Sequence, residues 1–408
     1  MIEKISYKKN KHSVLAVEDK CNRCLSKHIV IAENNHYYCE DCYENRIISD
    51  HLYLERYERI RKSVGHQLSL SFALSESQIK GSNFINDCYV NKNQGYLHAV
   101  CGAGKTEMSL HTIFQALKFG NSIVFVIPRV EIIKQLYQRF MNYFPKSNIC
   151  PLYQDMPFDE SADLYISTPQ QLIKFYKEFD LMFIDEVDAF PYYRNKHLHR
   201  LVNKSLKDSG VLIYISATLP SDYKQMIDRE EMQYCLIPNR FHGKDLVIPS
   251  FKKYAYMYSD KLLADILKYT VNQKKLMIYF PSINLMTRYK WFLEKNHIMC
   301  EMISSKTKYR NEPLRKFKNN DYHILLTTTL LERGITFSNC DVFVFESDHH
   351  VFNKDTLTQI AGRVGRDQFF TSGNLIFYSR FITKDMIKAR DEMTRMNRMK
   401  KNDMQVMS

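Results

Sequence analysis

The chain of 408 residues is poor in the residues that interrupt regular structure, with only 12 glycines and 11 prolines. This scarcity excludes a collagen-like chain and a largely disordered one. Long apolar runs are also missing, because stretches such as 123–128 and 211–215 have the length of a strand, whereas a transmembrane helix needs roughly 20 residues. Residues 1–13 are polar and basic and lack the apolar core of a secretory signal. We therefore expect a cytoplasmic protein that is peripheral to a membrane at most.

Acidic residues are outnumbered by basic ones. The chain has 58 lysines and arginines against 45 aspartates and glutamates, a formal charge of +13. Such an excess favours a polyanionic partner, either nucleic acid or an acidic membrane surface. A lysine-rich solvated surface produces the same excess, so charge alone leaves the partner open. The hydrophobic fraction of 45% and the charged fraction of 25% are typical of a folded globular protein.

The apolar pattern divides the chain into segments of different character. Short apolar strands alternate twice with amphipathic helices, and a stretch with two prolines and a glycine at 237–252 separates the two series. This alternation predicts an α/β fold with two parallel sheets covered by helices. The expected segments are 1–50 with clustered cysteines, 51–75 as a helical linker, 76–240 and 241–383 as the two α/β domains, and 384–408 as a solvated basic helix.

Residues 101–106, with the sequence Cys-Gly-Ala-Gly-Lys-Thr, follow an expected strand and open an expected helix. This is the context of a phosphate-binding P-loop, in which backbone N–H groups at a helix N-terminus face phosphate oxygens. Lys105 is expected to reach the β- and γ-phosphates of ATP, and the Thr106 hydroxyl to bind Mg²⁺. The predicted ATP-binding residues of this loop are Gly102, Ala103, Gly104, Lys105 and Thr106.

An acidic run, Asp-Glu-Val-Asp at 185–188, follows the apolar strand 181–184. Such a strand delivers its carboxylates to the carboxyl edge of a parallel sheet, where ligands bind. Asp185 suits the Mg²⁺ shell, and Glu186 suits the orientation or deprotonation of the attacking water. Read alone, the run is more often a solvated turn, but a P-loop in the same domain favours the catalytic interpretation.

Two arginines in the second α/β segment complete the predicted catalytic set. Arg363 and Arg366 are three residues apart, so we expect them on one face of a helix. Arginine stabilises the charge that develops on the γ-phosphoryl group. Hydrolysis would then depend on closure of the second domain onto the first. The alternative is a basic surface helix.

Four of the ten cysteines are paired in the sequence. Each pair has two intervening residues, and 14 residues separate the pairs. Two such pairs can close a tetrahedral site, and four thiolates with no open position suit structural Zn²⁺. His28 and His36 are alternative ligands, while disulfides are disfavoured in a reducing cytosol. The predicted zinc ligands are Cys21, Cys24, Cys39 and Cys42.

These motifs follow one another in the order typical of superfamily 2 helicases and translocases, which the chain resembles. The resemblance implies two tandem RecA-like domains and translocation along a nucleic-acid strand. It identifies Ser216, Ala217 and Thr218 as a motif that couples the nucleotide site to nucleic acid. The implied nucleic-acid contacts are Arg129, Thr168, Thr327 and Thr328. Further implied ATP contacts are Gln78, Gln359 and Gly334.

The cysteine quartet, the P-loop and the strings at 185–191, 327–336 and 359–366 together resemble the late competence protein family ComFA, over nearly the whole chain. The resemblance implies a cytosolic ATPase, related to the helicase PriA, that helps to bring single-stranded DNA through the membrane channel ComEC. ComFC is a further implied partner, and homo-oligomers are compatible with this function. Two alternatives stay open: a replication-restart or RNA helicase, and a zinc-containing adaptor with an inactive ATPase fold.

Overall fold

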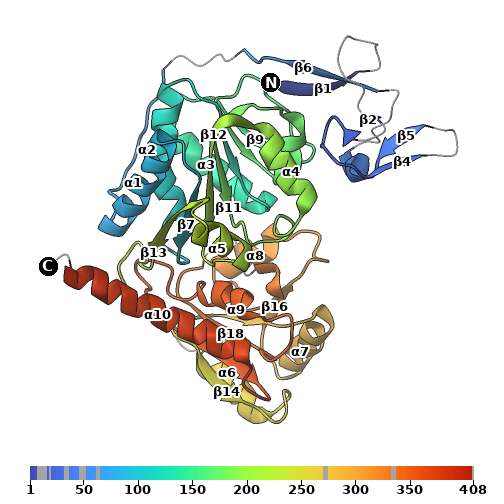
Figure 1. Ribbon diagram of the computed structural model, residues 1–408. Coiled ribbons are helices and arrows are strands. Elements are labelled where there is room, and N and C mark those ends of the chain that lie inside the picture. The colour runs from blue at the N-terminus through green and yellow to red at the C-terminus, as the bar shows by residue number, and fades with distance from the viewer. Residues whose placement is uncertain are drawn as a thin grey trace. The chain divides into compact units, whose positions relative to one another are not determined.

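The computed structural model describes residues 1–6, 16–17, 20–31, 36–45, 52–60, 65–269, 274–331 and 337–406. The chain forms two compact units, and each contains one large β-sheet with helices packed on it (Figure 1). The first unit comprises Met1–His98 and Lys105–Leu236, and the second comprises Ala99–Gly104 and Ile237–Ser408.

The sheet of the first unit has seven strands in the order β13-β7-β12-β11-β8-β10-β9. The strands from β7 to β9 pair in parallel, so their carboxyl ends lie along one edge of the sheet. All four residues of β8 are fully buried, as expected for a parallel sheet that is covered on both faces. The bounds are β7 Gly95–Ala99, β8 Ile123–Val126, β9 Ile149–Leu152, β10 Leu164–Ser167, β11 Phe179–Asp185, β12 Leu206–Ser216 and β13 Gln233–Ile237.

Helices of the first unit follow the strands in the βα alternation that the sequence predicts. In α3, Ile133, Leu136 and Phe140 are buried at helical spacing and form the stripe that packs on the sheet. The α4 helix begins after Asn195, whose side chain accepts a hydrogen bond from the Leu198 N–H at 3.1 Å. The bounds are α1 Glu76–Val90, α2 Lys105–Lys118, α3 Val130–Tyr143, η2 Pro169–Lys174, α4 Lys196–Ser205 and α5 Ser221–Asp228.

The second unit has a six-stranded parallel sheet in the order β14-β19-β18-β15-β17-β16. Along β15, Leu276 and Ile278 pack into one apolar cluster, while Met277 and Tyr279 pack into another on the opposite face. The prediction of an α/β fold with two tandem RecA-like sheets is therefore confirmed. The strands are β14 Ser250–Lys253, β15 Lys275–Tyr279, β16 Cys300–Ile303, β17 Ile324–Thr327, β18 Cys340–Val344 and β19 Leu375–Ser379.

The C-terminal helix differs from the solvated helix that the sequence predicts. The helix α10 packs beside α9, with Met386, Ala389 and Met393 buried on one face. These residues have the i, i+3, i+7 spacing of an amphipathic helix, which the lysines and arginines between them obscured. The helices of this unit are α6 Asp260–Tyr269, α7 Ile283–Lys295, α8 Asn311–Lys318, η4 Thr329–Leu331, α9 Lys354–Ala361 and α10 Lys384–Val406.

The predicted helix in the linker 51–75 is wrong where the structure describes it. Tyr53–Tyr57 forms strand β6, which pairs antiparallel with β1, Ile2–Ser6. Leu54 on β6 lies opposite Ile5 and is almost fully buried. The spacing of apolar residues in so short a segment fits a helix and a strand alike, and a partner about fifty residues away in the sequence decides the outcome.

Residues between these two strands form a small module around the four cysteines, which we call the cysteine module (residues 16–45 as described). It contains two short antiparallel pairs, β2 with β3 and β4 with β5, and one 3₁₀ turn, η1. With so little regular structure the module has no large apolar core of its own. Its elements are β2 Ala16–Val17, β3 Lys20–Cys21, β4 Ile29–Ile31, β5 Tyr37–Cys39 and η1 Glu40–Asn45.

One buried lysine joins this N-terminal region to the first sheet. Lys204 on α4 is fully buried, and its ammonium group donates to the Glu3 carboxylate on β1. It also donates to the carbonyl oxygens of Arg23 at 2.7 Å and Ile173 at 3.0 Å. The three N–H donors of the ammonium thus meet three acceptors from three segments. Arg56 on β6 donates to the same Glu3 carboxylate at 2.9 Å.

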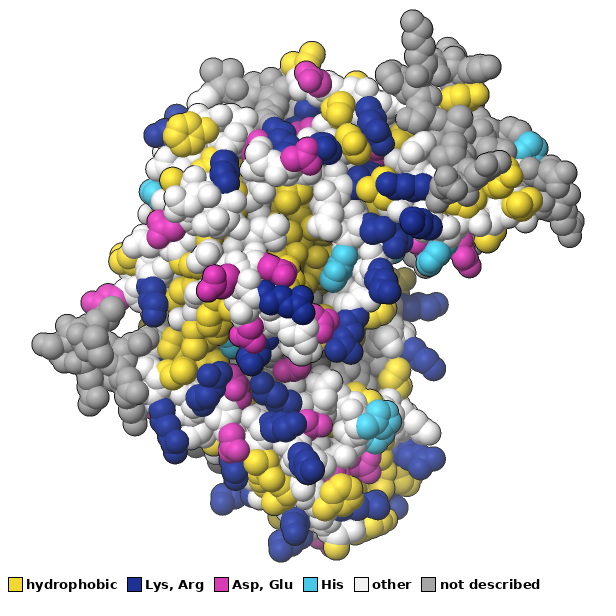
Figure 2. Space-filling view, in the orientation of Figure 1, with side chains coloured by type: hydrophobic (Ala, Val, Ile, Leu, Met, Phe, Trp, Pro, Cys, Tyr) yellow, Lys and Arg dark blue, Asp and Glu magenta, His cyan; other side chains and the backbone are white. Residues whose placement is uncertain are grey.

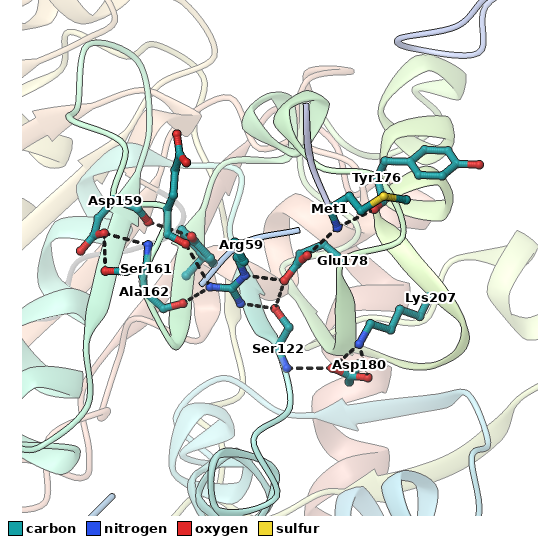
Figure 3. Close-up of polar contacts among 12 residues, drawn as sticks. Met1, Arg59, Ser122, Asp159, Ser161, Ala162, Tyr176, Glu178, Asp180 and Lys207 are labelled. Atoms are coloured by element: carbon teal, nitrogen blue, oxygen red, sulfur yellow. Dashed lines mark hydrogen bonds and ion pairs between the residues drawn. The ribbon is translucent and has the colours of Figure 1, made fainter. Parts of the chain in front are cut away.

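Arg59 forms a second anchor just after β6 (Figure 3). Its guanidinium donates to the Glu178 carboxylate, the Ser122 hydroxyl and the Ala162 carbonyl oxygen. Glu178 also pairs with the Met1 ammonium group at 2.6 Å. Burial would raise the pKa of Glu178, but these two cations hold that pKa below its usual value. Paired buried charges therefore hold the N-terminal region on the first unit.

We expect Lys204→Met to lower the free energy of unfolding by about 3–5 kcal/mol, because it leaves the Glu3 carboxylate buried without its main partner. Urea unfolding followed by circular dichroism measures this loss. The matched control is Lys207→Met on β12, which breaks a partly exposed ion pair with Asp180 at 2.8 Å and should cost at most about 1 kcal/mol. Equal losses in the two variants would contradict the anchoring role of Lys204.

Candidate nucleotide site and cysteine cluster

The predicted P-loop occupies the turn between β7 and α2. β7 ends at Ala99 and α2 begins at Lys105. Gly102 and Gly104 have φ angles of +84° and +79°, in the left-handed region that side chains rarely adopt. The two glycines thus permit the turn that directs the chain into the N-terminus of α2. This is the backbone arrangement that a phosphate-binding loop requires.

Asp185 is the last residue of β11, at the carboxyl edge of the first sheet. Burial raises the pKa of its carboxyl group to about 6, the positive charge of Lys105 opposes this rise, and the charge of Glu186 adds to it. At neutral pH the group is therefore mainly a carboxylate within electrostatic reach of the first lysine of α2. A carboxylate and an ammonium group so placed fit a nucleotide phosphate with its Mg²⁺ ion.

Glu186 has an unusual backbone conformation and a buried carboxylate oxygen. Its φ angle is +54°, which is uncommon for a residue with a side chain, and its N–H donates to Asp185 Oδ1 at 2.9 Å. Its Oε2 atom is buried, and no group in the described part of the chain hydrogen bonds to it. A buried carboxylate oxygen needs a donor, and a water molecule can supply one. The side chain is thus suited to orienting a water beside Asp185.

The predicted coupling motif contacts the acidic run directly. The Ser216 hydroxyl donates to Asp188 Oδ1 at 2.6 Å, and the Thr218 hydroxyl donates to Asp188 Oδ2 at 2.7 Å. Ala217 between them is buried, with its carbonyl oxygen 3.2 Å from His98 Nε2. The carboxylate of Asp188 is therefore held by both hydroxyls of the motif. A shift of the acidic run would be transmitted to the turn that follows β12.

Gln78 has a structural partner in this conformation. It lies in the first turn of α1 and is buried, and its Oε1 atom accepts a hydrogen bond from the Ser75 N–H at 3.0 Å. A Gln at this position caps the helix by satisfying an N–H group that has no partner within the helix. The predicted adenine contact of Gln78 stays a prediction.

The predicted nucleic-acid contacts lie at strand ends. Arg129 and Thr168 follow the carboxyl ends of the neighbouring strands β8 and β10, so both belong to the same edge of the first sheet, where Arg129 is partly exposed and Thr168 is buried. In the second unit, Thr327 ends β17, but it is fully buried and its hydroxyl donates to the Ile303 carbonyl oxygen at 3.1 Å. Thr328 is partly exposed and is the better placed of the two threonines.

Arg363 and Arg366, the two arginines predicted to be catalytic, do not share a helical face, contrary to the expectation from their spacing. The helix α9 ends at Ala361, before both of them. Gly365 has a φ angle of +64°, which a continuing helix does not allow, and it lies in the turn between Arg363 and Arg366. Arg363 is buried and Arg366 is partly exposed.

Two further predicted ATP contacts belong to this unit. Gln359 in α9 is buried, and within the second unit the Cys101 thiol of the P-loop donates to its Oε1 atom at 3.2 Å. Gly334, with the end of its motif at 332–336, lies outside the described residues. Both assignments stay predictions.

Arg240 is a further candidate for binding the nucleotide phosphates, and the sequence analysis did not identify it. Its side chain is 1% exposed, and Nη1 donates to the Gly365 carbonyl oxygen at 2.5 Å. Nε and Nη2 are buried without a hydrogen-bond partner in the described part of the chain. Burial lowers the pKa of this guanidinium to about 10, the charge of Cys101 opposes the change, and the charge of Arg366 adds to it. No motif marked this residue, because the sequence around it reads only as a linker.

The four predicted zinc ligands converge. Their sulfur atoms all lie within 4.8 Å of one another, and all four residues are buried. The Cys21 and Cys42 sulfurs are 3.9 Å apart, and those of Cys24 and Cys39 are 3.4 Å apart, far longer than a disulfide bond. A tetrahedral ion with Zn–S bonds of about 2.3 Å sets its sulfurs about 3.8 Å apart. The cluster therefore fits structural Zn²⁺.

The two histidines considered as substitutes are not part of this cluster, which among the described residues consists of cysteines alone. His28 instead lies 3.4 Å from Asp41. The Asp41 carboxylate also accepts hydrogen bonds from Ser26 at 2.6 Å and from Arg200 on α4. Figure 2 shows Lys and Arg side chains gathered on the surface around α4 and the adjoining cysteine module.

Comparisons with known proteins agree with this architecture. The type III restriction enzyme res subunit family matches residues 62–221, and the helicase conserved C-terminal domain matches residues 259–368. Among solved structures, Saccharomyces cerevisiae Dbp5 bound to RNA and ADP BeF3 is similar with a TM-score of 0.58 over 79% of this chain and 92% of that one. Its 15% identity shows the fold alone. The protein is a helicase-like ATPase of superfamily 2.

Curated relatives narrow the class further. ComFA of Streptococcus pneumoniae is 32% identical over 376 residues, covering 89% of this chain and 86% of that protein. ComFA of Bacillus subtilis is 29% identical over 396 residues, covering 93% and 85%. The transcription-repair-coupling factor of Staphylococcus aureus is 23% identical, and the match covers only 27% of it. The chain belongs to the competence protein ComFA family. None of the helices in the described ranges has the length and apolar character of a membrane span.

We expect the purified protein to hold one zinc ion per chain, because four thiolates fill a tetrahedral shell. Cys24→Ser and Cys42→Ser should each lose most of this metal, as measured by elemental analysis after gel filtration. Cys300→Ser, which alters a partly buried thiol outside the cluster, is the control and should retain it. Retention of a full equivalent of zinc by Cys42→Ser would contradict the assignment.

Proposed function

We propose that the protein is an ATP-dependent translocase on single-stranded DNA that drives DNA import across the cytoplasmic membrane during natural transformation. The observation that carries the proposal is the placement of Asp185 at the end of β11, within electrostatic reach of Lys105, the first residue of α2 after the turn at Gly102 and Gly104. Membership of the ComFA family supports the role in competence. The cytoplasm, at the inner face of this membrane, is the proposed location.

The P-loop and the first unit supply the groups that bind the phosphates and Mg²⁺ in this proposal. Backbone N–H groups of residues 102–104 hold the phosphates at the N-terminus of α2. Lys105 binds the β- and γ-phosphates, and Thr106 and Asp185 would hold Mg²⁺, which neutralises charge on the phosphate oxygens. Glu186 orients the attacking water and accepts its proton, a role that its buried, unpartnered Oε2 atom supports.

The second unit supplies positive charge in the same proposal. Arg363 and Arg366 stabilise the γ-phosphoryl group when the two domains close on one ATP molecule, so that each cycle of binding and hydrolysis closes and opens them. Arg240 joins this set because its buried guanidinium has N–H groups without partners in the described chain. Gln78, Gln359 and Gly334 complete the proposed nucleotide contacts.

Nucleic acid is proposed to bind along the sheet edges through its phosphates. Arg129, Thr168, Thr327 and Thr328 are the proposed contacts, and Thr328 is favoured over Thr327 because it is partly exposed. Hydroxyl and guanidinium groups bind phosphates without reading the sequence. The hydrogen bonds of Ser216 and Thr218 to Asp188 support coupling of this interface to the nucleotide site. The membrane channel ComEC, ComFC and further copies of the chain are the proposed protein partners.

We expect Lys105→Ala to lower ATP turnover at least a hundredfold, because the β- and γ-phosphates lose their ammonium partner. Phosphate release, measured with and without an unstructured DNA oligonucleotide, reports this loss. Lys118→Ala is the control, since it removes an exposed lysine from the other end of α2. A wild-type protein that binds DNA without hydrolysing ATP would support the adaptor hypothesis instead.

Single-stranded DNA should stimulate ATP turnover more than duplex DNA or RNA of the same length. The reason is that contacts to phosphates and unstacked bases require an open strand. Stimulation should fall as salt concentration rises, because counterions compete for the phosphate contacts. Stimulation by RNA alone would contradict the DNA translocase and favour an RNA helicase. A preference for duplex or forked DNA would favour a replication-restart helicase.

A further inference from the structure

A pocket of about 540 Å³ lies in the first unit where the cysteine module meets the large sheet. One wall comes from β1 and from Arg23, between the first two cysteines of the cluster. The other walls come from the loop after β9, at Gln154 and Phe158, and from η2, at Gln171 and Lys174. The pocket is distinct from the P-loop and the acidic run.

Arg23 is the unusual residue of this pocket. Arg23 is only 7% exposed, yet its Nε and Nη1 atoms have no hydrogen-bond partner in the described part of the chain. Its carbonyl oxygen is fixed by Lys204 at 2.7 Å, so its backbone is held in place. Buried guanidinium N–H groups without acceptors are costly, and such a group lining a cavity indicates a ligand that supplies the acceptors.

Lys174 brings a second positive charge to the same cavity. It is partly buried, and no carboxylate in the described ranges forms an ion pair with it. Burial lowers its pKa, and the charge of Arg23 lowers it further, so the two cations share one electrostatic environment. Its Nζ atom lies 5.1 Å from the centre of the Phe158 ring, which covers one side of the ammonium group. Two cations on one cavity favour an anion between them.

Acidic side chains of the lining do not cancel these charges. Glu3 is already bound by Lys204 and Arg56, and its side chain is fully buried. Lys4 forms an ion pair with Glu160 at 2.7 Å, so it does not change the net charge of the pocket lining. Among the acidic side chains of the lining, only the exposed Asp155 remains against Arg23 and Lys174. The charges of the cluster cysteines act on Arg23 but are not among the groups that line the pocket. The amides of Gln154 and Gln171 add neutral donors. This set of donors matches the oxygens of a phosphate group.

The position of the pocket points to the source of the phosphate. Its loops follow the carboxyl ends of β9 and β10, which are neighbouring parallel strands at one side of the sheet. Ligands of parallel sheets bind at this edge. Thr168, a proposed nucleic-acid contact, is the residue before η2, and Gln171 and Lys174 belong to η2 itself. A strand that contacts Thr168 would therefore reach the pocket within the next nucleotides.

We propose that Arg23 and Lys174 form a phosphate-binding pocket that takes one backbone phosphate of a bound single-stranded nucleic acid, so that the cysteine module is part of the nucleic-acid path. This inference rests on the proposed function, because it extends the same binding edge. The inference assigns the cysteine module a direct contact with the nucleic-acid strand, in addition to the expected binding of zinc.

Fluorescence anisotropy of a labelled oligo-dT strand, without nucleotide, tests the pocket. Arg23→Gln and Lys174→Gln should each weaken binding about tenfold, because each removes a charged partner of one phosphate. The slope of log affinity against log salt concentration should fall by about 0.7 for the lost phosphate contact. Lys177→Gln is the matched control: it removes the same charge three residues further on, from an exposed lysine that pairs with Asp208. It should bind DNA within about twofold of wild type.

Several outcomes would contradict the assignment of this pocket as a binding site for a nucleic-acid phosphate. One is equal binding by Lys177→Gln and Lys174→Gln, and another is unchanged affinity in Arg23→Gln with its zinc retained. If Arg23→Gln loses zinc, Lys174→Gln decides, because Lys174 lies outside the module. Calorimetric titration with inorganic phosphate distinguishes a DNA phosphate from a free phosphate ion. If Lys174→Gln abolishes the binding of inorganic phosphate but leaves the affinity for DNA unchanged, the pocket binds a free phosphate and the DNA contact is rejected. The proposed function fails by a different result, namely that the wild-type protein does not turn over ATP.

Discussion

Parallel strand pairing is the constraint on which the functional arrangement depends. A parallel sheet brings the carboxyl ends of its strands to one edge, whatever their order in the sequence. The P-loop follows β7, the acidic run begins at the last residue of β11, the predicted coupling motif begins at the last residue of β12, and Arg129 and Thr168 follow β8 and β10. Groups separated by more than a hundred residues thereby come to the same edge. The hydrogen bonds from Ser216 and Thr218 to Asp188 are a direct result of the β11–β12 pairing.

The N-terminal region is held to this scaffold in a different way, through buried charges. The position of the cysteine module is fixed by the hydrogen bonds of Lys204 to the Arg23 carbonyl and of Arg200 to Asp41, and by its four cysteines, which belong to the buried cluster of the first unit. Arg59 fixes the segment that follows β6. Buried ion pairs add less net stability than apolar packing, but they tolerate only one arrangement of donors and acceptors. The four converging cysteines order the module internally, and the charged groups fix its orientation on α4. The two contributions together set the position of Arg23.

Most of the fold and the core of the site could be predicted because their signals are local. The P-loop at 101–106, the acidic run at 185–188 and the cysteine pairs are short strings whose chemistry is fixed by spacing. Strand β6, Arg240 and Arg23 could not be found in this way, since a strand partner or a burial state depends on residues far along the chain. The expectation that Arg363 and Arg366 share a helical face was wrong because Gly365 decides the turn after α9, and a glycine alone does not reveal its φ angle. Local patterns therefore identify the chemistry, while long-range contacts place it.

The three hydrogen bonds of the Lys204 ammonium group have a consequence for how the first unit opens. They join β1 through Glu3, the cysteine module through the Arg23 carbonyl, and η2 through the Ile173 carbonyl. None of these segments can leave without exposing or stranding a buried charge, so they form one cooperative unit of local unfolding. A loss of order at the four cysteines would therefore loosen η2, the segment that follows Thr168, together with the module. The cysteine cluster is thereby linked to the order of an edge of the sheet that its own residues do not form.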